Sequence, residues 1–265
     1  MNSEAGEIAH AFVDARQSWK PISNYPGSPP VDLASAYSIQ DKAISIWNRP
    51  IGGWKVGKIN VPASDSLGAN RLIGPVFEDA IQRENNEGNV FRIFEGGFAA
   101  VEAEFMLRLD PKDAALPRDR DEAMDWVDEV CIGIEVASSP YAKINQDGPC
   151  VTVSDHGNNA GLLIGKRVDR TVWDTLDDVD ISLDIDGREV GKATTSTMLD
   201  GPFGAVCFLL RNLAQRGIKP QAGWWISSGA ITGVHEIAAG AIALARFKDI
   251  GEIATRVETD PTRLR

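Results

Sequence analysis

Hydrophobic residues recur at two different spacings along the chain, and the spacing changes near residue 51. From Glu7 to Trp19 apolar side chains recur every three or four residues, which predicts an amphipathic helix ending before Pro21. A proline-rich segment follows, and a second helix is expected after a cap at Asp32 or Ser35. From residue 51 onward, short apolar segments bounded by glycines and polar turns indicate β-strands.

The predicted strands follow one another with few helices between them. Their sequences are IGGWKVGKIN, FRIF, FAAVEAEFMLRL, VCIGIEVAS, GLLIGKRV, ISLDIDGREV, GWWIS and AIALARF. Only two later helices are expected, over residues 119–129 and 202–216. Because strands and helices do not alternate, a doubly wound nucleotide-binding fold and a TIM barrel are disfavoured. The pattern favours an α+β fold, a mixed β-roll or barrel with a few peripheral helices.

Composition and charge narrow the classes of partner. With 265 residues, 43% of them hydrophobic, the chain can bury a sizeable core, so disorder is a poor interpretation. The net charge of −11 repels phosphate backbones and anionic lipids, so neither a nucleic acid nor a membrane is expected as a partner. The longest nearly apolar run, residues 237–245, is about half of the ~20 residues that a membrane helix needs.

The cysteines and the N-terminal segment indicate a reducing compartment. Cys131, Cys150 and Cys207 cannot all pair, and Cys131 lies in an apolar run where a buried free thiol belongs. The first residues carry two glutamates and no basic stretch before a long apolar segment, so they do not resemble a secretory signal. We therefore expect a cytoplasmic protein.

The common nucleotide-binding, hydrolase and zinc motifs are absent from the sequence. The candidate functional groups on the predicted strands are therefore carboxylates. The period of two places Glu102 and Glu104 on one face of FAAVEAEFMLRL, with Cα atoms roughly 6.6 Å apart. Glu135 interrupts a second apolar strand. Buried glutamates repel each other unless a cation neutralises them. Carboxylate oxygens are ligands that suit Mg²⁺ or Mn²⁺. A solvated face or an ion pair remains an open alternative explanation of these glutamates.

Three further segments carry polar groups with two possible interpretations each. Burial of Lys55 in GGWKVGK would lower its pKa toward neutrality and make it an acid or base, although a surface lysine is the commoner case. The segment SDHGNN at 154–159, with Asp155 and His156, is a binding loop or an ordinary turn. The same holds for the segment Ser227, Ser228 and Gly229, which follows the aromatic pair Trp224 and Trp225.

Taken in order, these motifs resemble the fumarylacetoacetate hydrolase superfamily, in particular its 2-keto-4-pentenoate (2-hydroxypenta-2,4-dienoate) hydratase and 4-oxalocrotonate decarboxylase branch. The motifs are AYSIQ at 36–40, GGWKVGK at 52–58, VEAEF at 101–105, GIEVASS at 133–139, SDHGNNAGLLIGK at 154–166 and LRNLAQRGIKPQAGWWISSGAITG at 210–233. The resemblance spans nearly the whole chain, and VEAEF with the later glutamate is its most specific part.

The resemblance implies a fold, a cofactor and an activity. The fold is a core of the fumarylacetoacetase C-terminal-like type, which we divide into a smaller, largely helical N-terminal portion over 1–80 and a catalytic β-roll domain over 81–265. One Mg²⁺ or Mn²⁺ is expected on Glu102, Glu104 and Glu135, with Lys55 as the catalytic proton carrier. The expected reaction adds water to 2-hydroxypenta-2,4-dienoate in the catabolism of aromatic compounds, and homo-oligomers are common in the family.

Two departures from the family pattern bear on the substrate. Hydratases of this branch tend to have an aspartate in a GVDxPxxG-like loop, where this chain offers Asn70, an amide that cannot transfer protons. The family often has Asp-Ser-Arg after the third glutamate, where this chain has SSP at 138–140; Arg71 is one candidate to replace that cation. The candidate substrate-binding residues are Asn70, Arg71, Ser139, Asp155, His156, Ser228 and Gly229.

Two alternatives to the hydro-lyase stay open. The same site could decarboxylate a 2-oxo acid of the 4-oxalocrotonate or oxaloacetate type, because both reactions use the same electron sink. The change at Asn70 also leaves room for a non-catalytic subunit that supports a partner enzyme of the same pathway.

Overall fold

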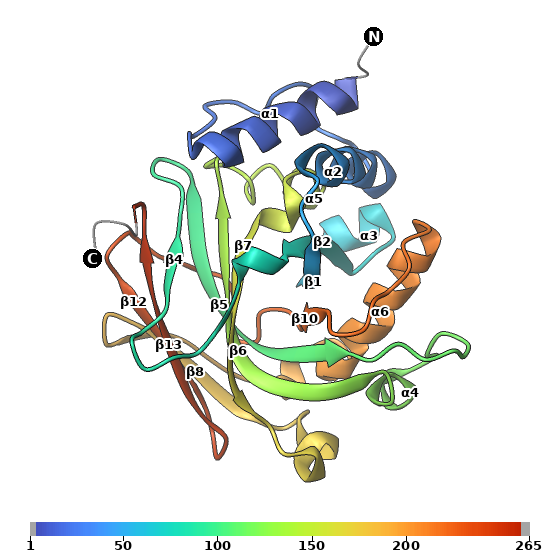
Figure 1. The fold of residues 1–265 in the computed structure, drawn as a ribbon, viewed down its shortest axis with the longest axis vertical. Coiled ribbons are helices and arrows are strands. Elements are labelled where there is room, and N and C mark those ends of the chain that lie inside the picture. Colours follow the sequence, from blue (N-terminus) through green and yellow to red (C-terminus); the bar gives the residue numbers. More distant parts are fainter. Residues whose placement is uncertain (1–3, 261–265) are drawn as a thin grey trace.

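Two helices begin the computed structural model, which describes residues 4–260. They are α1 (Glu4–Ser18) and α2 (Leu33–Trp47), and both predicted helices are confirmed. Asp32 caps α2, its side chain accepting a 2.7 Å hydrogen bond from the backbone N–H of Ser35. The two helices pack together at one end of the molecule, beyond the ends of the long strands (Figure 1).

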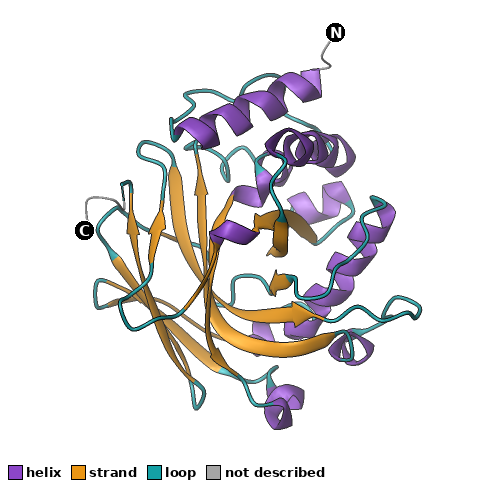
Figure 2. Cartoon of the chain, in the orientation of Figure 1, coloured by secondary structure: helices purple, strands orange, loops and turns teal. Residues whose placement is uncertain are grey.

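The strands form two mixed sheets that lie beside the helices (Figure 2). The larger sheet has the order β2-β1-β10-β5-β6-β7-β3, with β11 paired to β5, and the smaller has the order β4-β13-β12-β8-β9. The larger sheet comprises β1 (Ile51–Lys58), β2 (Arg71–Phe77), β3 (Ile81–Arg83), β5 (Phe98–Leu109), β6 (Val127–Ser139), β7 (Asn159–Arg167), β10 (Trp225–Ser227) and β11 (His235–Glu236). The smaller comprises β4 (Val90–Arg92), β8 (Asp180–Ile185), β9 (Arg188–Thr194), β12 (Ile242–Phe247) and β13 (Gly251–Glu258).

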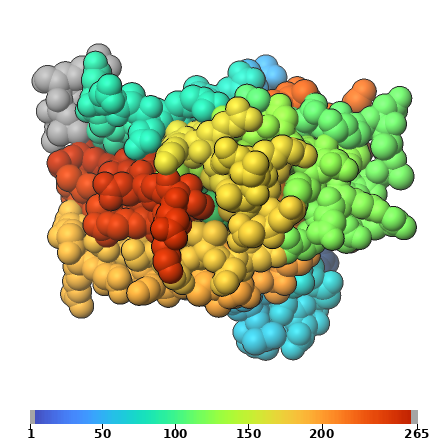
Figure 3. Space-filling view, turned by 90° about the horizontal axis from the view of Figure 1, so that it is seen from below, coloured from blue at the N-terminus to red at the C-terminus, as the bar shows by residue number. Residues whose placement is uncertain are grey.

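The remaining helices are short except for the one that covers β1 and β10. They are α3 (Ala63–Leu67), α4 (Arg120–Met124), α5 (Pro149–Ser154) and α6 (Gly201–Gln215), and 3-10 turns lie at Glu78–Ala80, His156–Asn158, Arg170–Thr175 and Thr195–Thr197. Viewed from below, the segment around α3 stands out from the surface in cyan (Figure 3). The predicted α+β class, a mixed sheet with peripheral helices, is confirmed.

One predicted helix is wrong in its second half. The helix expected over 119–129 ends at Met124, and the chain enters β6 at Val127. Pairing with β5 overrides the local helical pattern, and Arg108 of β5 forms ion pairs with Asp128 and Glu129 across the two strands. The helix expected over 202–216 is confirmed as α6.

The period of two along β5 decides what faces the core. Val101, Ala103, Phe105 and Leu107 lie in the main hydrophobic cluster, as predicted. The ring of Phe105 lies 5.3 Å from that of Phe247 in β12, so this face of β5 joins the two sheets. The opposite face of β5 is thereby left to carry the two glutamates.

The structure also bears on the cysteines, on membrane-spanning helices and on the division of the chain. Cys131, Cys150 and Cys207 are buried and free. Within residues 4–260, no helix combines the length and apolar character needed to cross a bilayer. The division of the chain at residue 80 stays a prediction; β1 and β2, from the first part, pair within the same sheet as β5 and β6.

Candidate functional site

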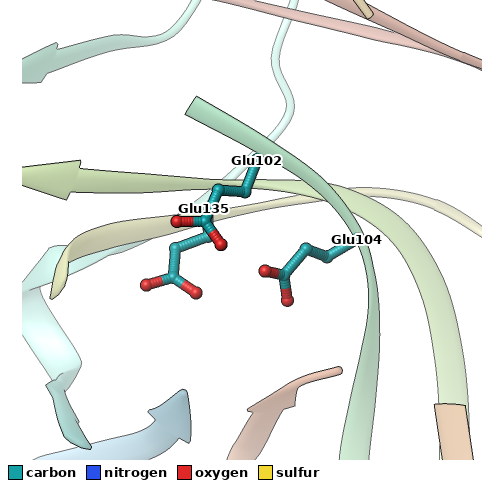
Figure 4. A group of neighbouring side chains, drawn as sticks. All are labelled: Glu102, Glu104 and Glu135. Carbon is teal, nitrogen blue, oxygen red and sulfur yellow. The ribbon is translucent and has the colours of Figure 1, made fainter. Parts of the chain in front are cut away.

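Glu102, Glu104 and Glu135 meet in the interior of the larger sheet. Glu102 and Glu104 lie two residues apart on β5, and Glu102 is directly opposite Glu135 of β6 in the strand register. All three side chains are buried, and one carboxylate oxygen from each lies within 4.8 Å of the others. Figure 4 shows the three carboxylates turned toward a common space from the two neighbouring strands.

The hydrogen bonds around the three glutamates leave part of their charge uncompensated. Ser227 Oγ contacts both Glu104 Oε2 and Glu135 Oε2, but its hydroxyl has one proton and can donate to one of them at a time. The backbone N–H of Gly229 donates to Glu104 Oε2 over 2.7 Å, and Asn159 Nδ2 donates to Glu135 Oε1 over 3.0 Å. Glu104 Oε1 is buried with no hydrogen-bond partner among the described residues, which is costly for an ionised oxygen.

Lys55 supplies one positive charge to this group. It lies on β1, is 4% exposed, and its Nζ is 3.3 Å from Glu135 Oε1. Burial alone would lower the pKa of Lys55, but the charges of Glu135, Glu102 and Glu104 outweigh burial and raise its pKa above the usual value. The lowered pKa expected from the sequence is therefore wrong, because it considered burial without the carboxylates.

The glutamates themselves are hard to ionise together. Burial is the main cause that raises the pKa of Glu102 to about 7, against the opposing charge of Lys55. Burial and the charges of Glu135 and Glu102 raise the pKa of Glu104 well above its usual value. Three carboxylates and one ammonium group leave two negative charges uncompensated when all are ionised.

The residues present fit a divalent cation. The donors are hard carboxylate oxygens, one of them unpartnered, and their uncompensated charge equals that of one such ion. A solvated glutamate face is excluded because all three side chains are buried. An ion pair is present through Lys55, but it does not balance the cluster.

A cavity of about 680 Å³ lies beside the site. It is large enough for a small organic acid. Lys55 and Glu102 line it, as do three predicted substrate-binding residues, Arg71, Ser228 and Gly229. Much of the remaining wall is apolar, with Leu72 and Ile231 among its members.

Three residues at or beside this site were not among the predicted site residues, although Ser227 and Asn159 lie in segments that the sequence marked as turns or binding loops. Ser227 ends β10, and Asn159, the last residue of the polar segment 154–159, begins β7. Arg16 of α1 is 8% exposed and binds that same segment. One sequence signal could have found Arg16: it lies four and eight residues after Phe12 and Ile8, on the apolar face of the helix.

Comparisons with known proteins place this architecture. No family model matches the chain. The chain is 26% identical over 260 residues to the 2-keto-4-pentenoate hydratase of Paraburkholderia xenovorans (strain LB400), covering 96% of this chain and 95% of the relative. Its fold matches that of 4-oxalocrotonate decarboxylase from Pseudomonas putida G7, solved with calcium and acetate and with magnesium and adipate: TM-score 0.79, 19% identity, 96% of this chain and 97% of the other. In sequence and in fold the chain is therefore similar to proteins of the hydratase and decarboxylase branch of the fumarylacetoacetate hydrolase superfamily.

This finding confirms the resemblance to the hydratase and decarboxylase branch and the fumarylacetoacetase-like fold. A second relative, a 4-oxalocrotonate decarboxylase of Pseudomonas putida, is 28% identical over 135 residues, which is 49% of each chain. These similarities support an enzyme, and the buried glutamates support a divalent metal ion as its cofactor.

The other predicted substrate-binding residues lie apart from the cavity wall. Asn70 is exposed and lines a separate hollow between α2, α3 and α6. Asp155 is buried in an ion pair with Arg16. His156 is buried between aromatic rings, and Ser139 Oγ accepts a hydrogen bond from a neighbouring backbone N–H. Their assignment to substrate binding stays a prediction.

Proposed function

We propose that the protein is a divalent-metal-dependent hydro-lyase that adds water to 2-hydroxypenta-2,4-dienoate (2-keto-4-pentenoate) and yields a 4-hydroxy-2-oxo acid, within the catabolism of aromatic compounds. The observation that carries the proposal is the buried group of Glu102, Glu104, Glu135 and Lys55 beside a cavity of small-molecule size. In sequence, the match to the hydratase extends over 96% of the chain and the match to the decarboxylase over 49%, which favours hydration.

Each residue then has a role. Glu102, Glu104 and Glu135 hold Mg²⁺ or Mn²⁺, while Ser227 and Gly229 keep the carboxylate of Glu104 in place. A bound ion would supply a Lewis acid for the 2-oxo oxygen and the carboxylate of the substrate.

Lys55 carries the protons of the reaction. In the hydration, the dienol takes up a proton at its far end, and water then adds at C4 of the conjugated ketone. Lys55 lines the cavity and is held beside Glu135, so its Nζ holds a proton next to the bound acid and exchanges it with the substrate.

Decarboxylation of a 2-oxo dicarboxylic acid is the second candidate function. The position of Arg71 in the cavity wall favours it. Arg71 lines the same cavity as Lys55, and its partner there is the half-exposed carboxylate of Asp200. A carboxylate at the far end of a substrate could take the place of Asp200 as the partner of this guanidinium group.

We extend the proposal to the setting of the enzyme. We propose a cytoplasmic homo-oligomer that acts on a small 2-oxo or 2-hydroxydienoic acid and binds neither a nucleic acid nor a membrane. The net charge of −11 and the buried free thiols support this setting.

A screen with added metal tests the proposal. The purified protein is incubated with Mg²⁺ or Mn²⁺ and either 2-hydroxydienoates or 2-oxo dicarboxylates, and hydration and carbon dioxide release are followed in parallel. Loss of the dienol chromophore without carbon dioxide release supports the hydro-lyase. Carbon dioxide release without a hydration product decides for the decarboxylase, and activity that is unchanged in Lys55→Ala supports the non-catalytic alternative.

A further inference from the structure

A left-handed turn connects α5 to β7 and lies against the proposed active site. Three consecutive residues have positive φ angles: His156 at 52°, Gly157 at 65° and Asn158 at 55°. Gly157 adopts this region freely, whereas His156 and Asn158 do so at some cost, so the turn depends on support from its surroundings. The turn is also tightly covered, since a Cβ on Gly74 would lie 2.1 Å from the carbonyl oxygen of His156.

Arg16 of α1 holds both ends of this turn. At the front end it forms a two-pronged ion pair with Asp155, with Nε 2.5 Å from Oδ1 and Nη2 2.8 Å from Oδ2. At the far end its Nη1 donates to the carbonyl oxygen of Asn159 over 3.0 Å, and Nη2 reaches the carbonyl oxygen of Ser138 in β6 over 3.1 Å. Arg16 is 8% exposed and Asp155 is fully buried, so this clamp is protected from water.

The turn touches the active site at two points. Asn159 Nδ2 donates to Glu135 Oε1 over 3.0 Å, the same oxygen that faces Lys55. Gly157 packs against the aliphatic part of Lys55, and a Cβ there would lie 3.1 Å from Lys55 Cδ. A shift of the turn would therefore move both a carboxylate of the cluster and the lysine.

We propose that Asn159, held in place by the clamp of Arg16 on the turn at 155–159, is a positioning residue that fixes the carboxylate of Glu135 for metal binding. The inference rests on the proposed metal site and extends it to the N-terminal helix, because α1 supplies the clamp. Without the amide of Asn159, Glu135 Oε1 keeps only Lys55 as a partner and turns toward it. Outer hydrogen-bond partners of metal ligands typically contribute 10- to 100-fold in affinity.

The test measures the affinity for Mn²⁺ of the full chain by isothermal titration, after removal of metals with chelator. Asn159→Ala should raise the dissociation constant by about 10- to 100-fold. The matched control is Asn89→Ala, because Asn89 is as buried as Asn159, at 5%, and its side-chain amide also donates hydrogen bonds, here to Gln82 Oε1 and to the carbonyl oxygen of Arg83. The control should lower the melting temperature while leaving the dissociation constant for Mn²⁺ unchanged.

The role of Arg16 is tested with Arg16→Lys. Lysine keeps the charge that buried Asp155 needs, but it has no planar fork with which to hold both ends of the turn. We expect a folded protein that binds Mn²⁺ more weakly than the wild type, as Asn159→Ala does. Its KM for substrate should change by a smaller factor than its dissociation constant for Mn²⁺.

Two negative outcomes are distinct. If the wild type binds Mn²⁺ and Asn159→Ala binds it within twofold of the wild type, the positioning role is overturned and the proposed function stands. If the wild type itself binds no Mn²⁺ at millimolar concentration, the proposed function fails first. A dissociation constant in Arg16→Lys equal to that of the wild type, alongside a weakened Asn159→Ala, overturns the clamp.

Discussion

Glu102→Gln is expected to stabilise the protein against unfolding when divalent ions are removed. The pKa of Glu102 is raised from 4.5 to about 7, chiefly by burial, although the charge of Lys55 opposes the rise. The difference between these two values corresponds to about 3 kcal/mol of cost for holding the ionised carboxylate in the folded protein. Glutamine has the shape of the protonated acid and no charge, so the substitution removes this cost.

The effect of Glu102→Gln on the free energy of unfolding depends on pH. Below pH 4.5 the carboxyl of Glu102 is protonated in both the folded and the unfolded chain, and the substitution has little effect. Between pH 4.5 and about 7 the folded protein keeps a proton that the unfolded chain has lost, so its stability falls as the pH rises. Above pH 7 the full cost is present, and the variant should be more stable than the wild type by up to about 3 kcal/mol.

The assay is urea unfolding in chelator at pH 5 and pH 8, repeated at pH 8 with saturating Mg²⁺. The matched control is Glu129→Gln, a buried glutamate of β6 that has Arg108 at 2.8 Å and Arg83 at 3.6 Å as partners. The control should lose stability at pH 8, because glutamine loses the ion pairs that Glu129 makes with the partly exposed Arg108 and Arg83. A Glu102→Gln variant that is less stable than the wild type in chelator at pH 8, or that gains stability from Mg²⁺ as the wild type does, would refute the assignment.

Three further predictions follow from single side chains. Lys55→Met should lower kcat by about 10²- to 10⁴-fold while Mn²⁺ still binds, and full activity would exclude Lys55 as the proton carrier. Burial and the charges of Arg16 and Arg49 hold the pKa of His156 well below 6.5, so the wild type should lose up to about 1.4 kcal/mol of stability per pH unit as the pH falls below 6.5. His156→Asn should remove that slope in urea unfolding, and an unchanged slope would contradict the burial of a neutral imidazole. Arg71→Leu should raise KM for a dienoate with a distal carboxylate and leave KM for 2-hydroxypenta-2,4-dienoate unchanged; equal changes in both would exclude Arg71 as a carboxylate receptor.

The glutamate cluster was predictable because its geometry is local. Two residues of separation place Glu102 and Glu104 on one face of any strand, and an apolar run around Glu135 marks a buried position. The direction of the pKa of Lys55 was not predictable in this way. It depends on carboxylates of β5 and β6 that the fold places beside Lys55 of β1. The spacing of residues along the sequence does not predict this contact.

Segments were missed where tertiary contacts oppose the local pattern. Pro75 interrupts the β-type pattern of β2 in the sequence, so this strand was not predicted. The proline is tolerated because β2 lies at the edge of the larger sheet. α5 contains Val151, Thr152 and Val153, which favour a strand by their branching and form a helix only in their buried setting. The clamp of Arg16 joins residues 139 positions apart, a contact that only the folded chain makes.

The most direct test of the central claim is the stoichiometry of Mn²⁺ binding to the chelator-treated protein, measured for the wild type and Glu104→Gln. Glu104 is fully buried, holds the unpartnered oxygen and forms no ion pair with any of residues 4–260, so its substitution breaks no such pair. The account predicts one tightly bound Mn²⁺ per chain in the wild type and strongly weakened binding in the variant. A wild type that binds no Mn²⁺, or a variant that binds it with the same stoichiometry and dissociation constant, would contradict it.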